Sequence, residues 1–373
     1  MNKKLIYADH AATTPLSDAA WAVMTPFLRE ELGNPSSLHS WARKPREAVY
    51  EARATIARCI GAEPQEIFFT SGGTESDNWV IKGTEGGLLV SAYEHHAVLN
   101  AAASEAIHGR EVVYVRPKVG GYLMPETLSK KWTDGIKLVS VMTANNEIGT
   151  INPIKLLSEA AHKRGALFHT DAVQAVGHVP IDVHDADVDF LSASAHKFNG
   201  PKGIGFLYIR KGLELKQLIH GGQQESGLRA GTENVASIVG MAAALKENCD
   251  NIEQNADYLD RLKIHLVEGI SRLSEDVYFP GAKLGNQLPG FVSVSFPGHS
   301  AEGIVHVLDL KGVAISAGAA CDSKNTQISH VLRAINLPRK YAEGTVRITF
   351  GVENCEEDVR MILNAFKVAL KQV

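Results

Sequence analysis

The sequence has 373 residues, of which 45% are hydrophobic and 21% charged, and its formal net charge is −4. This composition predicts a globular protein with one large and one smaller domain, and it excludes a disordered or fibrous chain. The scattered Lys and Arg residues argue against direct nucleic-acid binding, and no stretch has the length of a signal peptide or a membrane span, so we expect a cytoplasmic protein.

Two helices are expected before the first strand. A short extended segment that Pro15 stops leads to Ser17, which is typical of a helix N-cap, whereas Pro26 should perturb the helix that follows. Apolar residues at helical spacing indicate a second helix, which Gly61 closes. The expected ranges are 18–29 for the first helix, 33–37 for a loop and 40–59 for the second helix.

Short apolar strands then alternate with helices. Because these strands have no polar face, we expect a mostly parallel sheet that is covered by helices on both sides. The predicted fold class is therefore α/β. The expected strands are 66–70, 88–91, 112–115, 138–141, 166–169, 188–191 and 204–209, and the expected helices are one that ends near 82 and those at 95–108 and 154–164.

The pattern changes near Asn234. One long helix with a single buried face is predicted from there to Leu273. Strands at 291–295 and 345–349 and helices near 301–310 and 356–370 follow it, which we interpret as a smaller α+β domain. The predicted large domain covers 16–255, and the predicted small domain covers 1–15 and 256–373.

Residues 191–205 contain a lysine in an unusual setting. An apolar run ends in small polar residues, and a His-Lys pair and two glycines around Pro-Lys follow, which places Lys197 at the mouth of the sheet. A lysine shielded from water has a lowered pKa, and its neutral amine condenses with an aldehyde to form a Schiff base. We interpret Lys197 as a covalent cofactor anchor; an ordinary solvated turn is the alternative.

Polar residues follow other predicted strands at the same edge of the sheet. The turn 71–74 opens a helix whose N–H groups suit a phosphate, although it lacks an ATP or NAD pattern, and a plain turn is the alternative. Asp171 suits a protonated pyridine nitrogen or caps a helix. His95 suits stacking on a planar cofactor or is structural, and Asn145-Asn146 suits a phenolate-like oxygen or a turn. Together these positions favour one cofactor site.

These segments resemble the successive motifs of the pyridoxal-phosphate-dependent cysteine desulfurases, the NifS/IscS-like branch of the class V aminotransferase family. The resemblance runs in order from about Tyr7 to Gly351, and the motifs are specific as a set. It implies a homodimeric fold-type I enzyme that binds pyridoxal 5'-phosphate, converts L-cysteine to L-alanine and passes the sulfur to an iron-sulfur scaffold or a thiolation enzyme. The segments that carry it are 11–15, 70–78, 94–98, 145–149, 171–174 and 196–203.

The resemblance also implies roles for individual residues. Lys197 forms the Schiff base, His95 stacks on the ring and moves protons, and Cys321 is the nucleophile. Arg347 pairs with the substrate carboxylate, which suits a bidentate guanidinium, and Asn34 lies nearby. The other implied cofactor contacts are Asp171 at the pyridine nitrogen, Asn146 and Gln174 at the phenolic oxygen, Gly73, Thr74, Ser194 and His196 at the phosphate, and Thr232 of the second subunit at that phosphate. The resemblance implies no metal site.

Cys321 belongs to a segment, 316–323, that resembles the catalytic-cysteine loop of group I desulfurases, in which the thiolate keeps the sulfur as a persulfide. None of the four cysteines has C-x-x-C spacing, so a thiol role is expected instead of a zinc site or a disulfide. Ala317, Ala319 and Asp322 stand where group I members commonly have serine, serine and threonine, and Asp322 should raise the pKa of the thiol. The sequence also ends at Val373, short of the longer C-terminal tails with which housekeeping members dock a scaffold protein. Both departures leave the identity of the sulfur acceptor open.

Other functions stay open at this point. A selenocysteine lyase or a class V transaminase would use the same fold, and Cys321 is the residue that separates them from a desulfurase. A non-catalytic assembly partner is a competitor of a different class. Lys197, Asp171 and Arg347 count against that competitor, because a protein without catalysis has no need of them.

Overall fold

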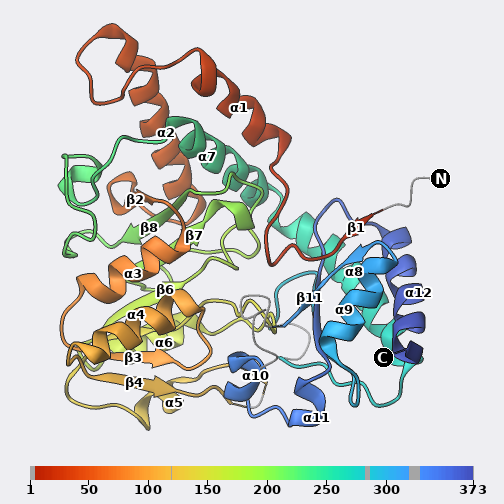
Figure 1. Cartoon of the computed structure of the whole chain (residues 1–373). Coiled ribbons are helices and arrows are strands. Elements are labelled where there is room, and N and C mark those ends of the chain that lie inside the picture. The colour runs from red at the N-terminus through yellow and green to blue at the C-terminus, as the bar shows by residue number, and fades with distance from the viewer. Residues whose placement is uncertain (1–4, 119, 282–285, 319–327, 373) are drawn as a thin grey trace.

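The computed structural model describes residues 5–118, 120–281, 286–318 and 328–372. Its larger sheet has seven strands in the order β2-β8-β7-β6-β5-β3-β4 (Figure 1). All neighbouring strands are parallel except the pairs that include β8, which runs antiparallel to β2 and to β7. The predicted mostly parallel α/β sheet is confirmed. The strands are β2 (Ile67–Thr70), β3 (Gly87–Ser91), β4 (Val112–Val115), β5 (Ile136–Ser140), β6 (Leu167–Asp171), β7 (Phe190–Ser194) and β8 (Gly205–Ile209).

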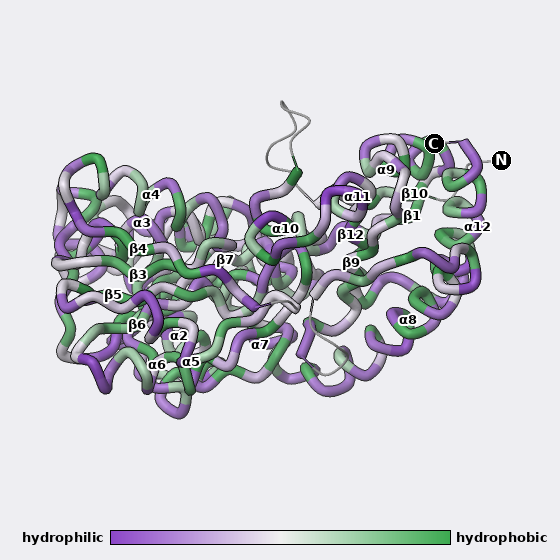
Figure 2. The backbone as a smooth tube through the Cα atoms, turned by 90° about the horizontal axis from the view of Figure 1, so that it is seen from below, coloured by the Kyte–Doolittle hydropathy of each residue, from purple (hydrophilic) through white to green (hydrophobic). Residues whose placement is uncertain are grey.

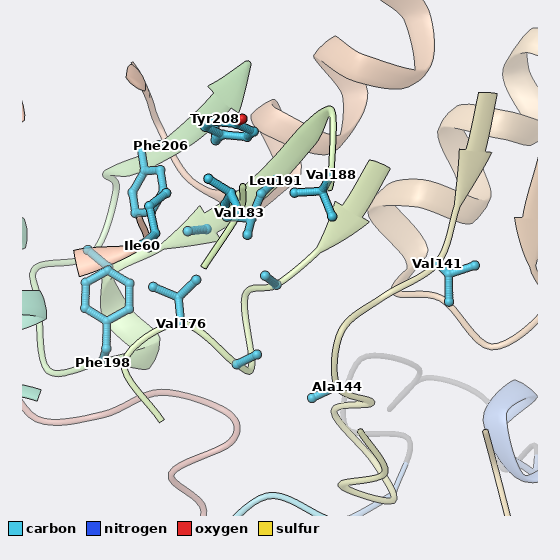
Figure 3. Close-up of a cluster of buried hydrophobic side chains, with 14 of the residues drawn as sticks. Ile60, Val141, Ala144, Val176, Val183, Val188, Leu191, Phe198, Phe206 and Tyr208 are labelled. Carbon is cyan, nitrogen blue, oxygen red and sulfur yellow. The ribbon is translucent and has the colours of Figure 1, made fainter. Parts of the chain in front are cut away.

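Helices cover both faces of this sheet, because successive strand residues point into different cores. Phe68 packs in a cluster with α3 and α4, whereas its neighbour Phe69 packs in the cluster that includes α2, α6 and α7. Figure 3 shows part of the cluster that includes α2, α6 and α7, to which the neighbouring strands β7 and β8 contribute Leu191 and Phe206. The helices are α1 (Asp18–Arg29), α2 (Arg43–Cys59), α3 (Gly73–Gly83), α4 (His96–Ile107), α5 (Pro125–Ser129), α6 (Ile154–His162) and α7 (Val235–Asp250).

A second group of elements lies at the other end of the molecule (Figure 2). Its antiparallel sheet has the order β11-β12-β9, and β1 and β10 form a parallel pair beside it. Its separate hydrophobic cluster joins residues of the first strand, such as Ile6, to residues as distant as Ala369. Its elements are β1 (Ile6–Tyr7), α8 (Ile252–Leu273), β9 (Phe291–Ser295), α9 (Ala301–Leu310), β10 (Val313–Ala314), β11 (Ser316–Ala317), β12 (Thr345–Thr349) and α12 (Glu356–Gln372).

The prediction of one helix from 234 to 273 is wrong. Asn251 has φ −118° and ψ 12°, outside the helical region, and it both ends α7 and precedes α8. Asp250 and Asn251 favour helix ends because their side chains compete for backbone hydrogen bonds. The buried faces on either side of Asn251 belong to two different cores, which a continuous helical pattern does not reveal.

The other predicted helices and strands differ from their predicted bounds by three residues or fewer, with Ser17 capping α1 as expected through a hydrogen bond from the Ala20 N–H (3.1 Å). Pro26 lies inside α1 without ending it. The sequence missed two-residue strands and the short helices α5, α10 (His330–Ala334) and α11 (Arg339–Ala342), which are too short to show a period. No helix among the described ranges is long and apolar enough to cross a membrane.

Candidate active site

A cavity of about 480 Å³ lies where the C-terminal ends of the parallel strands, the N-terminal segment and β12 meet. This is the edge at which open α/β sheets bind ligands. Most of the predicted cofactor and substrate residues line it together. They are Gly73, Thr74, His95, Asn146, Asp171, Gln174, Ser194, His196, Lys197 and Arg347.

Lys197 ends a short 3-10 turn, η3 (Ala195–Lys197), directly after β7. Its Nζ donates hydrogen bonds to the carbonyl oxygens of Ala11 (2.5 Å) and Ala12 (2.8 Å). Its own carbonyl oxygen is bound by Nε2 of the half-buried His178 at 2.8 Å. The N-terminal segment and His178 therefore fix the lysine from two sides, with its amine at the cavity wall.

Asp171 is the last residue of β6 and is only 4% exposed. One carboxyl oxygen, Oδ1, accepts a hydrogen bond from the Val173 N–H at 2.9 Å. Burial raises the pKa of Asp171 to about 6, although the Val173 N–H and the Lys197 ammonium both favour the ionised form. A carboxyl with this pKa binds a cationic ring nitrogen well, because the cation restores the charge balance that burial disturbs.

His95 is the N-cap residue of α4, and its Nδ1 accepts a hydrogen bond from the Ala97 N–H at 3.1 Å. Burial, with Lys197 and His96 nearby, lowers the pKa of His95 to about 4. The imidazole is therefore neutral, and its ring proton lies on Nε2. A neutral ring at the cavity wall can stack on an aromatic cofactor and exchange a proton through Nε2.

The start of α3 forms an anion cradle. Gly72 has φ +146°, which L side chains rarely adopt, and a Cβ on Gly73 would lie 2.6 Å from the Val173 side chain. Gly73 and Thr74 of this helix start line the cavity, and the first N–H groups of a helix, which have no partner within it, suit an anion there. His196 is neutral, since burial and two neighbouring lysines lower its pKa to about 4, and Nδ1 lies 3.2 Å from the Thr13 hydroxyl. Neutral donors and a helix N-terminus suit a phosphate.

These features fit pyridoxal phosphate. An amine for its aldehyde, a carboxyl for its ring nitrogen, a neutral imidazole for its face and an anion cradle for its phosphate all line one cavity. The residues that would hold the group are Lys197, Asp171, His95 and Gly73, and each of them comes from a different element. Gln174 joins them through the N-terminal segment, because its Nε2 donates to the Ala11 carbonyl at 2.9 Å.

Arg347 of β12 brings the second sheet to the cavity. Its Nη1 donates to the Asn146 carbonyl (2.6 Å) and its Nη2 to Asp9 Oδ1 (2.7 Å), and its side chain is 4% exposed. Its Nε–H has no hydrogen-bond partner among the described residues. A buried, oriented guanidinium beside the cofactor residues suits a substrate carboxylate.

Three predicted residues do not line the cavity of this chain. Asn34 is exposed, and its Oδ1 accepts from the Ser36 N–H at 2.9 Å, so it stabilises a turn. Thr232, which was expected to act from a second subunit, is exposed. Cys321 lies outside the described residues, although Gly318, three positions before it in the sequence, lines the cavity. The functional roles of Asn34, Thr232 and Cys321 stay predictions.

Sequence reasoning gave no role to several cavity residues: Asp77, His96, Glu147 and His330. Asp77 was detectable, since it lies one helical turn after Gly73 within one of the family motifs. His330 follows no predicted strand, yet its ring centre lies 4.5 Å from that of His96. No group of three or more His, Cys, Asp or Glu residues in the described ranges has the geometry to hold a metal ion.

The chain is similar to known proteins over nearly its whole length. The family model described as "Aminotransferase class-V" matches residues 6–362. The chain is 44% identical to "Cysteine desulfurase IscS" of Dictyoglomus turgidum, over 100% of this chain and 96% of that protein. It is also 42% identical to the protein of the same name from Methanosarcina thermophila, over 96% of this chain and 90% of that protein.

Solved structures are similar over nearly the whole chain. One, described as "NIFS-LIKE PROTEIN", has a TM-score of 0.92 and 36% identity, and the match covers 99% of this chain and 100% of that one. Another, described as "SspA in complex with cysteine", has a TM-score of 0.81 and 34% identity, and the match covers 92% of this chain and 98% of that one.

Proposed function

The chain belongs to the class V aminotransferase family and is a pyridoxal-phosphate-dependent cysteine desulfurase, and from this premise we propose which of its residues carry the reaction. The observation that supports the proposal is that Lys197, Asp171, His95 and Arg347 line one cavity. When bound, pyridoxal phosphate supplies an aldehyde for the substrate amine and an electron-withdrawing ring that labilises bonds at the substrate α and β carbons.

The residues of this chain bind and orient the substrate around that group. Arg347 binds the carboxylate of L-cysteine, with a guanidinium that Asp9 and Asn146 already hold in place. The Asp171 carboxylate keeps a proton on the ring nitrogen. Lys197 Nζ, released from the Ala11 and Ala12 carbonyls, takes the proton from the substrate α carbon. His95 Nε2 exchanges a second proton with the substrate.

Cys321 accepts the sulfur in this proposal. Its thiolate attacks the sulfur of the substrate, so that an S–S bond forms and the C–S bond breaks. The electron pair of the C–S bond stays on the β carbon, which takes up a proton, and the product is L-alanine. The sulfur remains on Cys321 as a persulfide.

Two substitutions test these roles. Lys197→Ala should abolish the visible absorbance band of the covalently bound cofactor, and a normal band in this variant would refute the anchor. Cys321→Ala should stop sulfur release from L-cysteine, whereas a class V transaminase would keep its turnover. Cys355→Ala is the matched control, because Cys355 does not line the cavity, and it should retain activity.

We also propose that the sulfur passes to a protein acceptor, either an iron-sulfur scaffold or a thiolation enzyme. The support is the expected persulfide on Cys321, a covalent carrier that must be discharged by another thiol. Labelling Cys321 with ³⁵S from L-cysteine and following the label in a cell extract would identify the acceptor. Transfer only to small thiols would count against a protein acceptor.

A homodimer and two domains are further proposals. Large apolar side chains around α1 and α2, such as Trp21, Leu32 and Trp41, are 55–74% exposed, and a second copy of the chain would cover them. Light scattering tests the dimer.

The separate hydrophobic clusters support two domains, one over 16–255 and one over 1–15 with 256–373, although α10 packs on the cluster of the larger sheet. Limited proteolysis tests the boundary between them. Cell fractionation tests the expected cytoplasmic location.

A further inference from the structure

Asp77 is a buried carboxyl to which the proposed reaction gives no role. It lies on α3, four residues after Gly73, and therefore on the side of the helix that faces the cavity. Its side chain is 1% exposed, and its Oδ1 has no hydrogen-bond partner among the described residues. A buried carboxylate without partners is costly, so this oxygen requires an explanation.

The nearest basic group does not supply a cation. Asp77 Oδ1 lies 3.6 Å from Nε2 of His169, which is fully buried. The His169 ring is hydrogen-bonded at both nitrogens to neutral hydroxyls, Ser140 Oγ at 2.9 Å and Ser192 Oγ at 3.0 Å. Burial lowers the pKa of His169 to about 3, so the ring is uncharged. Asp77 therefore faces a neutral imidazole.

The other ionisable groups around Asp77 are acids. Asp171 on β6 and Glu94 after β3 both act on it, and both raise its pKa. Glu94 is itself buried, with Oε1 accepting hydrogen bonds from Ser91 Oγ and from the Met142 N–H, and burial raises its pKa to about 8. The Lys197 ammonium acts on Asp171 and favours its ionised form. One cation thus faces three buried carboxyl groups, which cannot all be ionised.

We infer that Asp77 carries a proton and is a positioning residue that leaves Asp171 as the single carboxylate facing the ring of the cofactor. The inference rests on the proposed role of Asp171. A second anion beside Asp171 would raise the proton affinity of Asp171 and would compete for the positive charge on the ring nitrogen. A neutral Asp77 avoids both effects, and Ser192, within hydrogen-bonding reach of its carboxyl, satisfies part of it.

A protonated Asp77 makes stability depend on pH in a defined direction. Its pKa in the folded chain is raised well above the ordinary value, chiefly by burial, so the folded state holds a proton that the unfolded state releases. The free energy of unfolding therefore falls as pH rises from the pKa of Asp77 in the unfolded chain toward its pKa in the folded chain. Asp77→Asn, which has the same shape and no titration, removes this loss.

The first test compares full-length wild type and Asp77→Asn by denaturant unfolding at pH 5 to 8 with saturating pyridoxal phosphate. The unfolding equilibrium constant of the wild type should grow relative to that of the variant by up to about tenfold per pH unit. A ratio that stays constant with pH would overturn the inference. Asp77→Ala gives the same comparison without a new polar group, should the first variant fold poorly.

Asp189→Asn is the matched control. Asp189 is also a buried aspartate, 3% exposed, but it has charged partners, with Oδ1 at 3.3 Å from Arg210 Nε and Oδ2 at 2.7 Å from His162 Nε2. Arg210 stays charged at both pH values, and His162 is charged at pH 5, because its pKa, despite burial, is raised by its aspartate partners. Asp189→Asn should therefore be less stable than the wild type at both pH 5 and pH 8, with the larger loss at pH 5. This variant shows what the loss of a charged, paired carboxylate does in the same assay.

The second readout is the absorbance of the bound cofactor during a pH titration without substrate. If Asp77 is neutral, Asp77→Asn should titrate at the wild-type pH. A shift of about one pH unit or more would show that a negative charge was removed, and would overturn the inference. Failure of the wild type to bind pyridoxal phosphate would instead contradict the proposed function, and the unfolding comparison would still decide the state of Asp77.

Discussion

Asp171 and His95 have pKa values that the same cavity displaces in opposite directions, to about 6 and to about 4. Burial is the main cause for both, because it disfavours the charged form of an acid and of a base alike. At neutral pH the cavity therefore holds an ionised Asp171 and an uncharged His95. This is the combination that a ring nitrogen carrying a proton and a stacking base require.

The affinity for pyridoxal phosphate should depend on Asp171. Below about pH 6 the wild-type carboxyl takes up a proton in the empty cavity and loses its attraction for the ring nitrogen. The dissociation constant should then rise by up to about tenfold per pH unit. Asp171→Asn should bind pyridoxal phosphate more weakly at pH 8, and its dissociation constant should not rise below pH 6 for this reason. The phosphate of the ligand titrates equally with both proteins, so the comparison cancels its contribution. Parallel curves for the two proteins would contradict the assignment.

Arg347→Lys is expected to weaken the binding of L-cysteine while the chain still folds. Lysine keeps the charge but not the fork that now reaches Asn146 and Asp9, so a carboxylate loses a bidentate contact. The KM for L-cysteine should rise by roughly 10- to 100-fold, the equivalent of one charge-assisted hydrogen bond. Arg339→Lys, at an exposed pair with Glu343, is the control and should leave KM unchanged.

Among the elements, the segment 223–232 is held to α2 and to α3 by two ion pairs and to the sheet by a hydrogen bond from β2. Glu225 accepts from Arg53 Nη2 at 2.7 Å and from the Phe69 N–H at 2.9 Å, and Arg229 Nε lies 2.8 Å from Glu75 Oε1. Glu75 also accepts from the Ser71 N–H, which lies beside the anion cradle. The segment that contains Thr232 is therefore held beside the cradle by charge.

Backbone strain in that segment gives a testable consequence. Glu225 and the exposed Ser226 have φ of +47° and +58°, a region that costs L residues roughly 1–2 kcal/mol each. Ser226→Gly should remove part of that cost and raise the denaturant midpoint. Glu225→Gln should lower the midpoint through a loss of roughly 2–3 kcal/mol of unfolding free energy, because Arg53 then keeps a partly buried charge without its partner. Equal midpoints for both variants would refute this account.

At the scale of the whole molecule, the cavity is closed by segments that are distant in the sequence. Asp9 and Arg347, which bind each other, are 338 positions apart. The first strand, β1, belongs to the hydrophobic cluster around the antiparallel sheet, while the residues just after it hold Lys197. Movement between the two groups of elements would therefore change the substrate arginine and the lysine together.

The proposed dimer predicts complementation between two inactive variants. Lys197→Ala lacks the cofactor anchor, and Thr232→Ala lacks the phosphate contact that the second subunit is proposed to provide. A mixed dimer restores one complete site, so co-refolded protein should recover up to about a quarter of the wild-type activity if the subunits mix at random. Recovery should disappear when Trp41→Glu places a charge on the exposed apolar face. Full activity of Thr232→Ala alone would contradict the contribution in trans.

The sequence by itself determined the local features of this protein. Apolar strands such as β3 and β7 predicted a covered parallel sheet, and the polar residues at their ends predicted the cofactor cavity, because parallel strands end at one edge. Only the tertiary structure decided which distant groups meet there. The carbonyls that hold Lys197, the ionic partner of Arg347, the burial of Asp77 and the break at Asn251 depend on packing between segments far apart, and a local period carries no information about such contacts.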